Sequence, residues 1–234
     1  MPSATYAQRR GQIETYFDRT AAESWARLTS DAPVGRIRRT VRAGRDEMRR
    51  TVLDWLPADL GGRRVLDAGC GTGAFAVEAA RRGAEVLAVD ISPTLIGLAR
   101  DRAASRGWGD GRVSFRVGDM LDPAHGRFDH VVAMDSLIHY ALPDAVRALA
   151  GLAARANRSV AFTFAPRTPA LAAMHAVGRL FPRGDRAPAV EPVAEARLLG
   201  ALAAEPDLAG WWTARTRRVA SGFYISQAME LAAP

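Results

Sequence analysis

The chain contains the stretch Val65-Leu66-Asp67-Ala68-Gly69-Cys70-Gly71-Thr72-Gly73, in which a short apolar run leads into glycine at alternate positions. An alanine-rich helical pattern follows at once, from Ala74 to Arg82. Glycine permits positive φ and lacks the Cβ atom that would keep a ligand away from the backbone. The first N–H groups of the following helix have no partner within the helix and can face that ligand. The stretch therefore predicts a cofactor-binding turn of a doubly wound α/β domain.

Strands and helices alternate after this turn. The sequence predicts five strands of the parallel type, at Arg64–Ala68, Glu85–Asp90, Arg112–Val117, Phe128–Met134 and Ser159–Phe164. Helices are expected at Gly73–Arg82, Thr94–Ala104, Pro143–Ala156, Thr168–Phe181 and Val193–Ala203. The last two strands, Trp211–Val219 and Gly222–Met229, are expected to pair as an antiparallel hairpin. We therefore expect an α/β fold with a doubly wound, Rossmann-like sheet that is mostly parallel.

A helical N-terminal arm or lid is predicted for residues 1–60, and the α/β domain for 61–234, with a helical elaboration around 166–205. The first helix of the arm has one apolar face, made of Ile13, Tyr16, Phe17 and Ala21. A capping box at Thr20 and Glu23 indicates a second helix, which carries Trp25 and Leu28.

A longer amphipathic helix is predicted after these two, with Gly44 as the point where it would break. Many arginines lie opposite its apolar stripe, which consists of Val34, Ile37, Val41, Met48, Val52 and Leu56. Three interpretations of the arm stay open at this point. The arm closes over the cofactor turn through its aromatic residues, its arginine-rich helix lies on an anionic membrane surface, or the stripe packs in the core below solvated arginines.

Composition narrows the function classes. The 234-residue chain has a formal net charge of +7, and all 32 of its basic residues are arginine, which favours acidic partners. It has no apolar run of membrane-spanning length and no signal core at its N-terminus, so we expect a cytoplasmic protein. Its single cysteine, Cys70, excludes an intramolecular disulfide. No group of thiols and imidazoles has metal-ligand spacing, so no metal site is predicted.

Acidic residues end three consecutive predicted strands, and such strand ends converge at one edge of a parallel sheet. Asp90 is placed for the two hydroxyls of a ribose, and Asp119 for the exocyclic amine of a purine with Met120 against the ring. Asp67 lies where a charged amino group could approach. A dinucleotide also fits the glycines, but its pyrophosphate would meet this acid. A sulfonium nucleoside with an ammonium group is therefore favoured.

These residues resemble the class I S-adenosylmethionine-dependent methyltransferases. The resemblance lies in the turn at 65–73, in Asp90 after the second strand, and in Gly118-Asp119-Met120 after the third. The cofactor-binding residues predicted on this basis are Asp67, Gly69, Gly71, Gly73, Asp90, Ile91, Asp119, Met120, Asp135 and Ser136.

Further segments resemble a narrower family, the magnesium-protoporphyrin IX O-methyltransferases of chlorophyll biosynthesis. They are Tyr16–Ala21, Trp25–Leu28, Val41–Met48, Met134–Tyr140 and Gly222–Ser226. The composition suits the bacteriochlorophyll branch. The resemblance implies methyl transfer from S-adenosylmethionine to one propionate carboxylate of magnesium protoporphyrin, with magnesium present only as part of this substrate. From their position beside the methyl donor, we assign Tyr16 to the closing arm, and His139 and Tyr140 to orienting the reacting carboxylate or the magnesium.

The resemblance also implies transient contacts with the preceding magnesium chelatase and with the intracytoplasmic photosynthetic membrane. Nucleic acid is not an expected partner. Enzymes that methylate amino groups of nucleic acids resemble one another in a polar residue, two prolines and an aromatic after the fourth strand, and this pattern is missing after Met134. Three alternatives stay open: a methyltransferase of another small-molecule carboxylate or hydroxyl, an RNA methyltransferase, and a non-enzymatic cofactor-binding protein.

Overall fold

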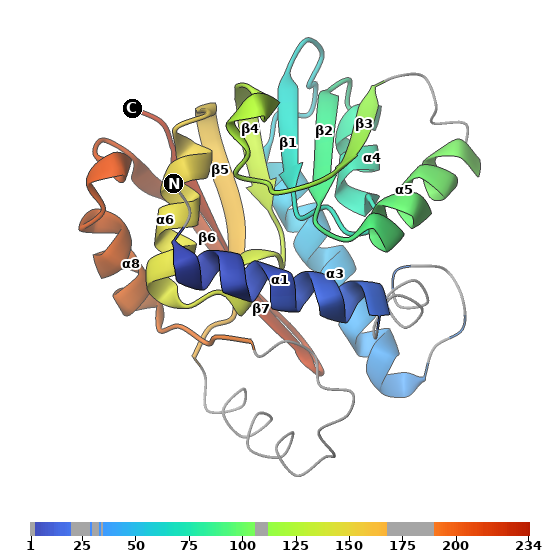
Figure 1. Ribbon diagram of the computed structural model, residues 1–234, viewed down its shortest axis with the longest axis horizontal. Coiled ribbons are helices and arrows are strands. Elements are labelled where there is room, and N and C mark those ends of the chain that lie inside the picture. The colour runs from blue at the N-terminus through green and yellow to red at the C-terminus, as the bar shows by residue number, and fades with distance from the viewer. Residues whose placement is uncertain (1–2, 20–28, 30–32, 34, 106–111, 168–189) are drawn as a thin grey trace.

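A computed structural model describes residues 3–19, 29, 33, 35–105, 112–167 and 190–234 of the chain. Seven strands form one sheet in the order β3-β2-β1-β4-β5-β7-β6 (Figure 1). Their bounds are β1 Arg64–Ala68, β2 Glu85–Asp90, β3 Val113–Val117, β4 Phe128–Ala133, β5 Ala156–Phe164, β6 Trp212–Ser221 and β7 Tyr224–Ala232. Strands β1 to β5 pair in parallel, and β7 lies antiparallel between β5 and β6. The predicted doubly wound sheet with its antiparallel terminal hairpin is confirmed.

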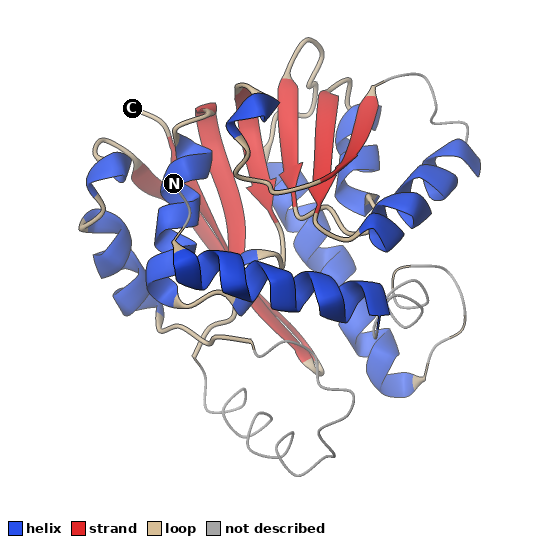
Figure 2. Cartoon of the chain, in the orientation of Figure 1, coloured by secondary structure: helices blue, strands red, loops and turns tan. Residues whose placement is uncertain are grey.

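Helices connect the strands on both sides of the sheet (Figure 2). They are α1 Ala4–Arg19, α3 Arg36–Trp55, α4 Ala74–Arg81, α5 Pro93–Ser105, α6 Leu142–Ala153 and α8 Glu195–Ala203, with 3₁₀ turns η1 Pro123–His125, η2 Leu137–His139 and η4 Pro206–Leu208. The helices α4, α5, α6 and α8 agree with the predicted ones to within one turn. The helix predicted at Thr168–Phe181 lies outside the described residues.

Alternate side chains of the strands enter two apolar layers, one on each face of the sheet. Leu66 of β1 and Val131 of β4 belong to the layer that α6 and α8 cover. Their neighbours Val65 and Val132 belong to the layer that α3 and α4 cover. The strands need apolar residues at successive positions because both faces of the sheet are covered.

Helix α1 runs across the carboxyl ends of the central strands (Figure 1). Its buried residues include Tyr6 and Ile13, which join the apolar layer on the side of α6. The helix begins before the apolar face that the sequence indicated, and the hydroxyl of Ser3 accepts a hydrogen bond of 3.1 Å from the N–H of Tyr6 at this start. The second arm helix, predicted from Thr20 with Trp25 and Leu28, lies outside the described residues.

Helix α3 is continuous through Gly44, as the long amphipathic stripe predicts, and the glycine does not break it. Gly44 lies against β7, where an added Cβ would come 2.5 Å from the Cδ1 atom of Tyr224. The glycine therefore allows close packing of an unbroken helix. The second half of the stripe, with Met48 and Val52, is fully buried in the core, whereas Ile37 near the start of the helix is 57% exposed. Core packing thus explains only the later part of this helix.

Candidate active site

The glycine turn connects β1 to the N-terminus of α4. Its glycines have positive φ, with 83° at Gly69, 54° at Gly71 and 77° at Gly73. At Gly69 the conformation comes with a close approach, because an added Cβ would lie 2.3 Å from the Cβ of Ser136. The N–H of Gly69 donates to the carbonyl of Val89 over 2.8 Å, which ties the turn to the neighbouring strand. A side chain at Gly69 would therefore separate the turn from the segment after β4.

Two acids of the predicted cofactor site lie beside this turn. The carboxylate of Asp90 accepts hydrogen bonds from the N–H of Gly71 over 2.8 Å and of Ser92 over 2.9 Å. Burial raises its pKa, and these two N–H donors oppose the rise. Asp67 is 2% exposed, and its Oδ2 atom has no hydrogen-bond partner among the described residues. Burial raises the pKa of Asp67 to about 7, while the N–H of Ala76 lowers it and the charge of Asp90 raises it further.

Helix α1 contacts the third acid. The hydroxyl of Tyr6 donates to the Oδ1 atom of Asp119 over 3.0 Å, and Arg10 forms an ion pair with the same carboxylate. The N–H of Leu121 also donates to Asp119 over 2.9 Å. At its other end, α1 places Asp18, which accepts a hydrogen bond of 2.6 Å from the hydroxyl of Ser92. Helix α1 is therefore fastened at both ends to the edge of the sheet where the acids meet.

Two of the predicted catalytic residues, His139 and Tyr140, contact rings near opposite ends of helix α1. His139 ends the 3₁₀ turn η2 and is 7% exposed. The ring of Phe17 on α1 lies edge-on to it, with 6.3 Å between the ring centroids, and Tyr16 lies edge-on to Phe17 at 5.3 Å. Tyr140 instead stacks on Tyr6 at 4.7 Å, and burial raises its pKa well above the usual range. Tyr16 and His139 are thus linked through Phe17, and Tyr140 lies on the side of Asp119.

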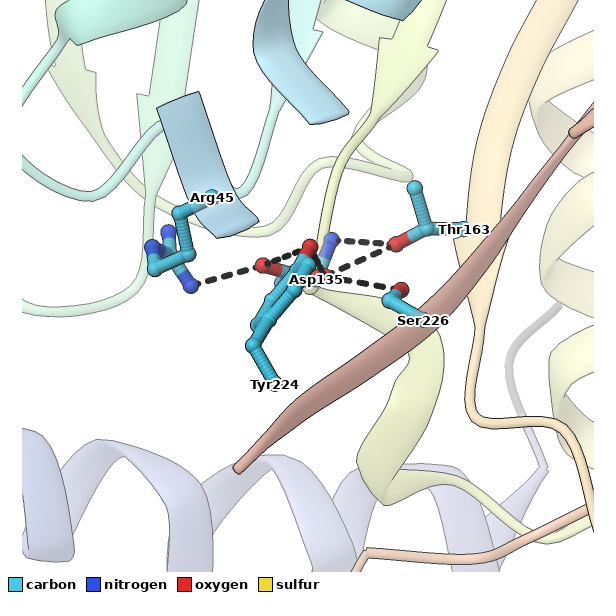
Figure 3. A network of polar contacts seen from close by, with 5 residues as sticks. All are labelled: Arg45, Asp135, Thr163, Tyr224 and Ser226. Atoms are coloured by element: carbon cyan, nitrogen blue, oxygen red, sulfur yellow. Dashed lines mark hydrogen bonds and ion pairs between the residues drawn. The ribbon is translucent and has the colours of Figure 1, made fainter. Parts of the chain in front are cut away.

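The predicted residues Asp135 and Ser136 lie between β4 and η2. Ser136 faces Gly69 of the turn, as the distance above shows. The carboxylate of Asp135 forms an ion pair of 2.7 Å with Arg45 of α3 and accepts a hydrogen bond of 3.1 Å from the hydroxyl of Tyr224 on β7 (Figure 3). Of the remaining predicted residues, Met120 is buried in the core, and Ile91 packs partly against it.

Several residues of the site were not predicted. Tyr6 and Arg10 lie before the apolar face that identified the first helix, so no pattern pointed to them. Arg45 and Tyr224 do fall within segments that carry the family resemblance, and that resemblance was the available signal. Within the described ranges, no group of three or more histidine, cysteine or acidic residues could hold a metal ion.

Comparisons with known proteins agree with this geometry. A family model described as "Methyltransferase domain" matches residues 65–158, and one described as "Magnesium-protoporphyrin IX methyltransferase C-terminus" matches residues 133–233. The chain is 52% identical over 231 residues to the magnesium-protoporphyrin O-methyltransferase of Rhodobacter capsulatus, covering 98% of this chain and 99% of the relative. It is 31% identical over 220 residues to the Synechocystis enzyme of the same name, covering 93% and 94% of the two chains.

A solved structure gives the same result for the fold. The crystal structure of magnesium protoporphyrin IX methyltransferase from Synechocystis PCC 6803 with bound SAH matches with a TM-score of 0.84 at 30% identity. The match covers 96% of this chain and 99% of that chain. Together with the identity to the R. capsulatus protein over nearly the whole length, this shows that the chain belongs to the magnesium-protoporphyrin IX methyltransferase family.

Proposed function

We propose that this chain transfers a methyl group from S-adenosylmethionine to one propionate carboxylate of magnesium protoporphyrin IX, which gives the monomethyl ester of bacteriochlorophyll biosynthesis. One observation carries the proposal beyond family membership. The glycine turn and the three acids lie at one edge of the sheet. At the same edge, the aromatic pair Tyr16 and Phe17 of α1 contacts His139 of η2 through the ring of Phe17. The cofactor site that we propose would therefore lie beside a group proposed to orient the substrate.

The residues at this edge suit the cofactor. Asp67 offers a buried carboxylate oxygen without a partner among the described residues, which fits an ammonium group. Asp90 and Asp119 have oxygen lone pairs left for the ribose hydroxyls and the adenine amine. The remaining residues that would line the site are Gly69, Gly71, Gly73, Ile91, Met120 and Ser136. The carboxylate of Asp135, which was also predicted there, is instead bound by Arg45 and Tyr224. When bound, S-adenosylmethionine supplies an electrophilic methyl carbon on a sulfonium sulfur.

The proposed reaction requires positioning rather than a strong base. A propionate is already ionised at neutral pH, so its oxygen can form the new bond to the methyl carbon as the carbon–sulfur bond breaks. The protein must align these atoms and exclude water, which can lower the barrier by about 7–11 kcal/mol in favourable cases. We assign Tyr16 to closing the arm over the site. His139 and Tyr140 are assigned to orienting the carboxylate or the magnesium of the substrate.

The direct test is to incubate the protein with labelled S-adenosylmethionine and magnesium protoporphyrin and to isolate the pigment. Labelled monomethyl ester is the expected product. No ester, together with label in RNA or in another acid, would refute the proposal. The residue roles are tested separately with the variants His139→Ala and Tyr16→Phe. If both keep full turnover and substrate affinity, the assignments of His139 and Tyr16 are wrong even though the reaction stands.

We also propose that the protein binds peripherally to an anionic membrane. In the described part of the chain, no helix combines the length and the apolar character needed to cross a bilayer. The start of α3 instead exposes Ile37 beside Arg36, Arg38 and Arg39. The tip of the β6–β7 hairpin adjoins this helix and carries Phe223, which is 52% exposed. Apolar side chains among arginines suit the surface of an anionic bilayer.

Co-sedimentation with phosphatidylglycerol vesicles tests this membrane proposal. The double change Ile37→Ser and Phe223→Ser should abolish binding, whereas Trp212→Ser, at a residue that is 53% exposed elsewhere on the sheet, should keep it. Equal binding of all variants would contradict it. A transient contact with the magnesium chelatase is proposed because that enzyme releases the substrate. Direct transfer predicts that a porphyrin-trapping protein such as albumin does not slow ester formation from the chelatase product.

A further inference from the structure

The segment that follows β4 has an unusual backbone. Asp135 has a φ of 55°, and among the described residues it is the one non-glycine residue with positive φ. Aspartate and asparagine tolerate this left-handed region better than most residues, but it still costs free energy. Such a conformation persists when the surrounding contacts impose it.

Four side chains from three elements contact the Asp135 carboxylate, and Figure 3 shows them converging on it. Arg45 of α3 forms the ion pair of 2.7 Å, with the Asp135 side chain only 5% exposed. Tyr224 and Ser226 of β7 donate hydrogen bonds of 3.1 Å and 3.4 Å to its Oδ1 atom. Thr163 of β5 donates to the same atom over 3.1 Å and accepts from the Asp135 N–H over 2.7 Å. Both the side chain and the backbone of Asp135 are therefore held.

This carboxylate lies one residue before the contact with the cofactor turn. Ser136 faces Gly69, and the next three residues form η2, which ends at His139. The direction in which η2 leaves β4 depends on the φ of Asp135. The network thus connects α3 and the terminal hairpin to the segment that presents His139 to the substrate.

We propose that the Asp135 carboxylate is a positioning residue for methyl transfer, which holds the turn at residues 135–139 so that Ser136 meets Gly69 and His139 faces the substrate. The inference rests on the proposed function, since that function gives His139 its role. Arg45 and Tyr224 act through Asp135. The energetic value of the network lies in alignment, because a misplacement of about 1 Å can lower a rate by about 100-fold.

A second ion pair with a buried carboxylate provides a matched control. Glu230 of β7 is 4% exposed and forms an ion pair of 2.6 Å with Arg215. This pair lies at the other end of β7. There the negative charge of Glu230 raises the pKa of His130, which burial lowers, and Arg215 donates to the carbonyl of Trp55 over 2.7 Å. Loss of the Glu230 charge should lower the stability, as loss of the Asp135 charge should. It should leave the conformation of the turn at residues 135–139 unchanged.

The experiment compares Asp135→Asn, Tyr224→Phe and Glu230→Gln in the full chain. Asparagine tolerates the left-handed backbone, so Asp135→Asn removes the charge rather than the conformation. We expect kcat with magnesium protoporphyrin to fall by about tenfold or more in Asp135→Asn and by less in Tyr224→Phe. Glu230→Gln should lower Tm by about as much as Asp135→Asn does, but it should leave kcat unchanged. The Kd for SAH should stay within about threefold in all three variants.

A second measurement does not depend on turnover. The chain has 4 histidines, so their ring signals can be assigned by NMR. Asp135→Asn should shift the His139 signal, and Glu230→Gln should shift that of His130 and not that of His139. An unmoved His139 signal in Asp135→Asn, or a kcat equal to that of Glu230→Gln, overturns the proposal. So does a rise in the SAH Kd with full kcat at saturating cofactor, which would make Asp135 a cofactor ligand. An inactive wild-type protein would refute the proposed function, while the His139 signal still tests the positioning role.

Discussion

Gly69 shows why the residue type matters at the cofactor turn. Its φ of 83° disfavours any side chain, and the position of an added Cβ, 2.3 Å from that of Ser136, leaves no space for one. The need for glycine therefore comes from the approach of the segment after β4 as much as from the ligand. The spacing of the glycines predicted the turn correctly. It did not predict that Ser136 lies against the turn, because this contact depends on the pairing of β1 with β4.

The change Gly69→Ala should lower the free energy of unfolding by about 1–3 kcal/mol, because the new methyl group clashes with Ser136. It should also weaken SAH binding, since the turn must move. Chemical denaturation measures the unfolding free energy, and calorimetric titration measures SAH binding. Gly97→Ala is the control, because nothing lies within 4 Å of a Cβ added there in helix α5. That variant should be as stable as the wild type or slightly more stable, and a similar loss in both variants would contradict the steric explanation.

Asp67 should make cofactor binding depend on pH. Its pKa of about 7 lies above the ordinary value of about 3.9, so the folded cofactor-free protein binds this proton more tightly than the unfolded chain. Stability should therefore decrease as the pH rises from about 4 to about 7 and then level off. An ammonium group beside Asp67 favours the ionised form. SAH affinity should thus increase between about pH 6 and pH 8.

Calorimetric titration of SAH over this pH range tests the role of Asp67. In Asp67→Asn the increase in affinity should disappear, and stability without cofactor should decrease less steeply toward neutral pH, because Asp90, whose pKa burial also raises, still titrates. An unchanged pH dependence in Asp67→Asn would show that another group titrates. It would also contradict the binding of the cofactor ammonium beside Asp67.

Among the elements, the two helices described before the sheet, α1 and α3, have different surroundings. Helix α1 lies over the edge of the sheet and touches Asp119 and Ser92, whereas α3 packs its second half into the core behind the sheet (Figure 1). The sequence showed an apolar stripe and many arginines but not which half of the stripe would be buried. Burial depends on Tyr224 of β7, which is far away in sequence and lies against Gly44. Local periodicity contains no information on such a contact.

The change Gly44→Ala should therefore displace α3 from β7. The added methyl group would overlap the ring of Tyr224, so we expect a loss of about 1–3 kcal/mol of unfolding free energy. A lower kcat should accompany it, because Arg45 and Tyr224 both contact Asp135. Gly11→Ala in α1 is the matched control, as no atom lies within 4 Å of a Cβ added at Gly11. Denaturation and turnover measured side by side check the difference, and equal stability of the two variants would refute it.

For the molecule as a whole, the sheet order and the cofactor edge followed from the chain because strands and helices alternate after Arg64. Apolar runs identified the covered strands, and acids at their ends identified the edge. The clustering of Tyr6, Arg10 and Arg45 at that edge could not be predicted, since it depends on how α1 and α3 return to the sheet. Residues of the same site thus come from segments that lie far apart in the chain, as Tyr6 and Asp119 do.

The net charge of +7 permits binding to any polyanion, so salt should separate such binding from the proposed reaction. Contacts with nucleic acid phosphates weaken steeply between about 50 mM and about 200 mM salt. Turnover with magnesium protoporphyrin requires no contact with a chain of phosphates and should change by less than about threefold over this range. Parallel measurements of ester formation and RNA retention provide the test. Salt-resistant RNA binding with methyl incorporation would instead support an RNA methyltransferase.

The place of β7 in the sheet has a consequence for biosynthesis. This strand follows β6 in sequence but lies between β5 and β6, and β6 pairs with no other strand among those described. On the ribosome, β6 therefore emerges before it has a partner, and the edge of β5 stays open to other nascent chains until β7 is made. Because β7 also delivers Tyr224 and Ser226 to Asp135, the chain acquires its sheet edge and its ordered site in one late step of synthesis.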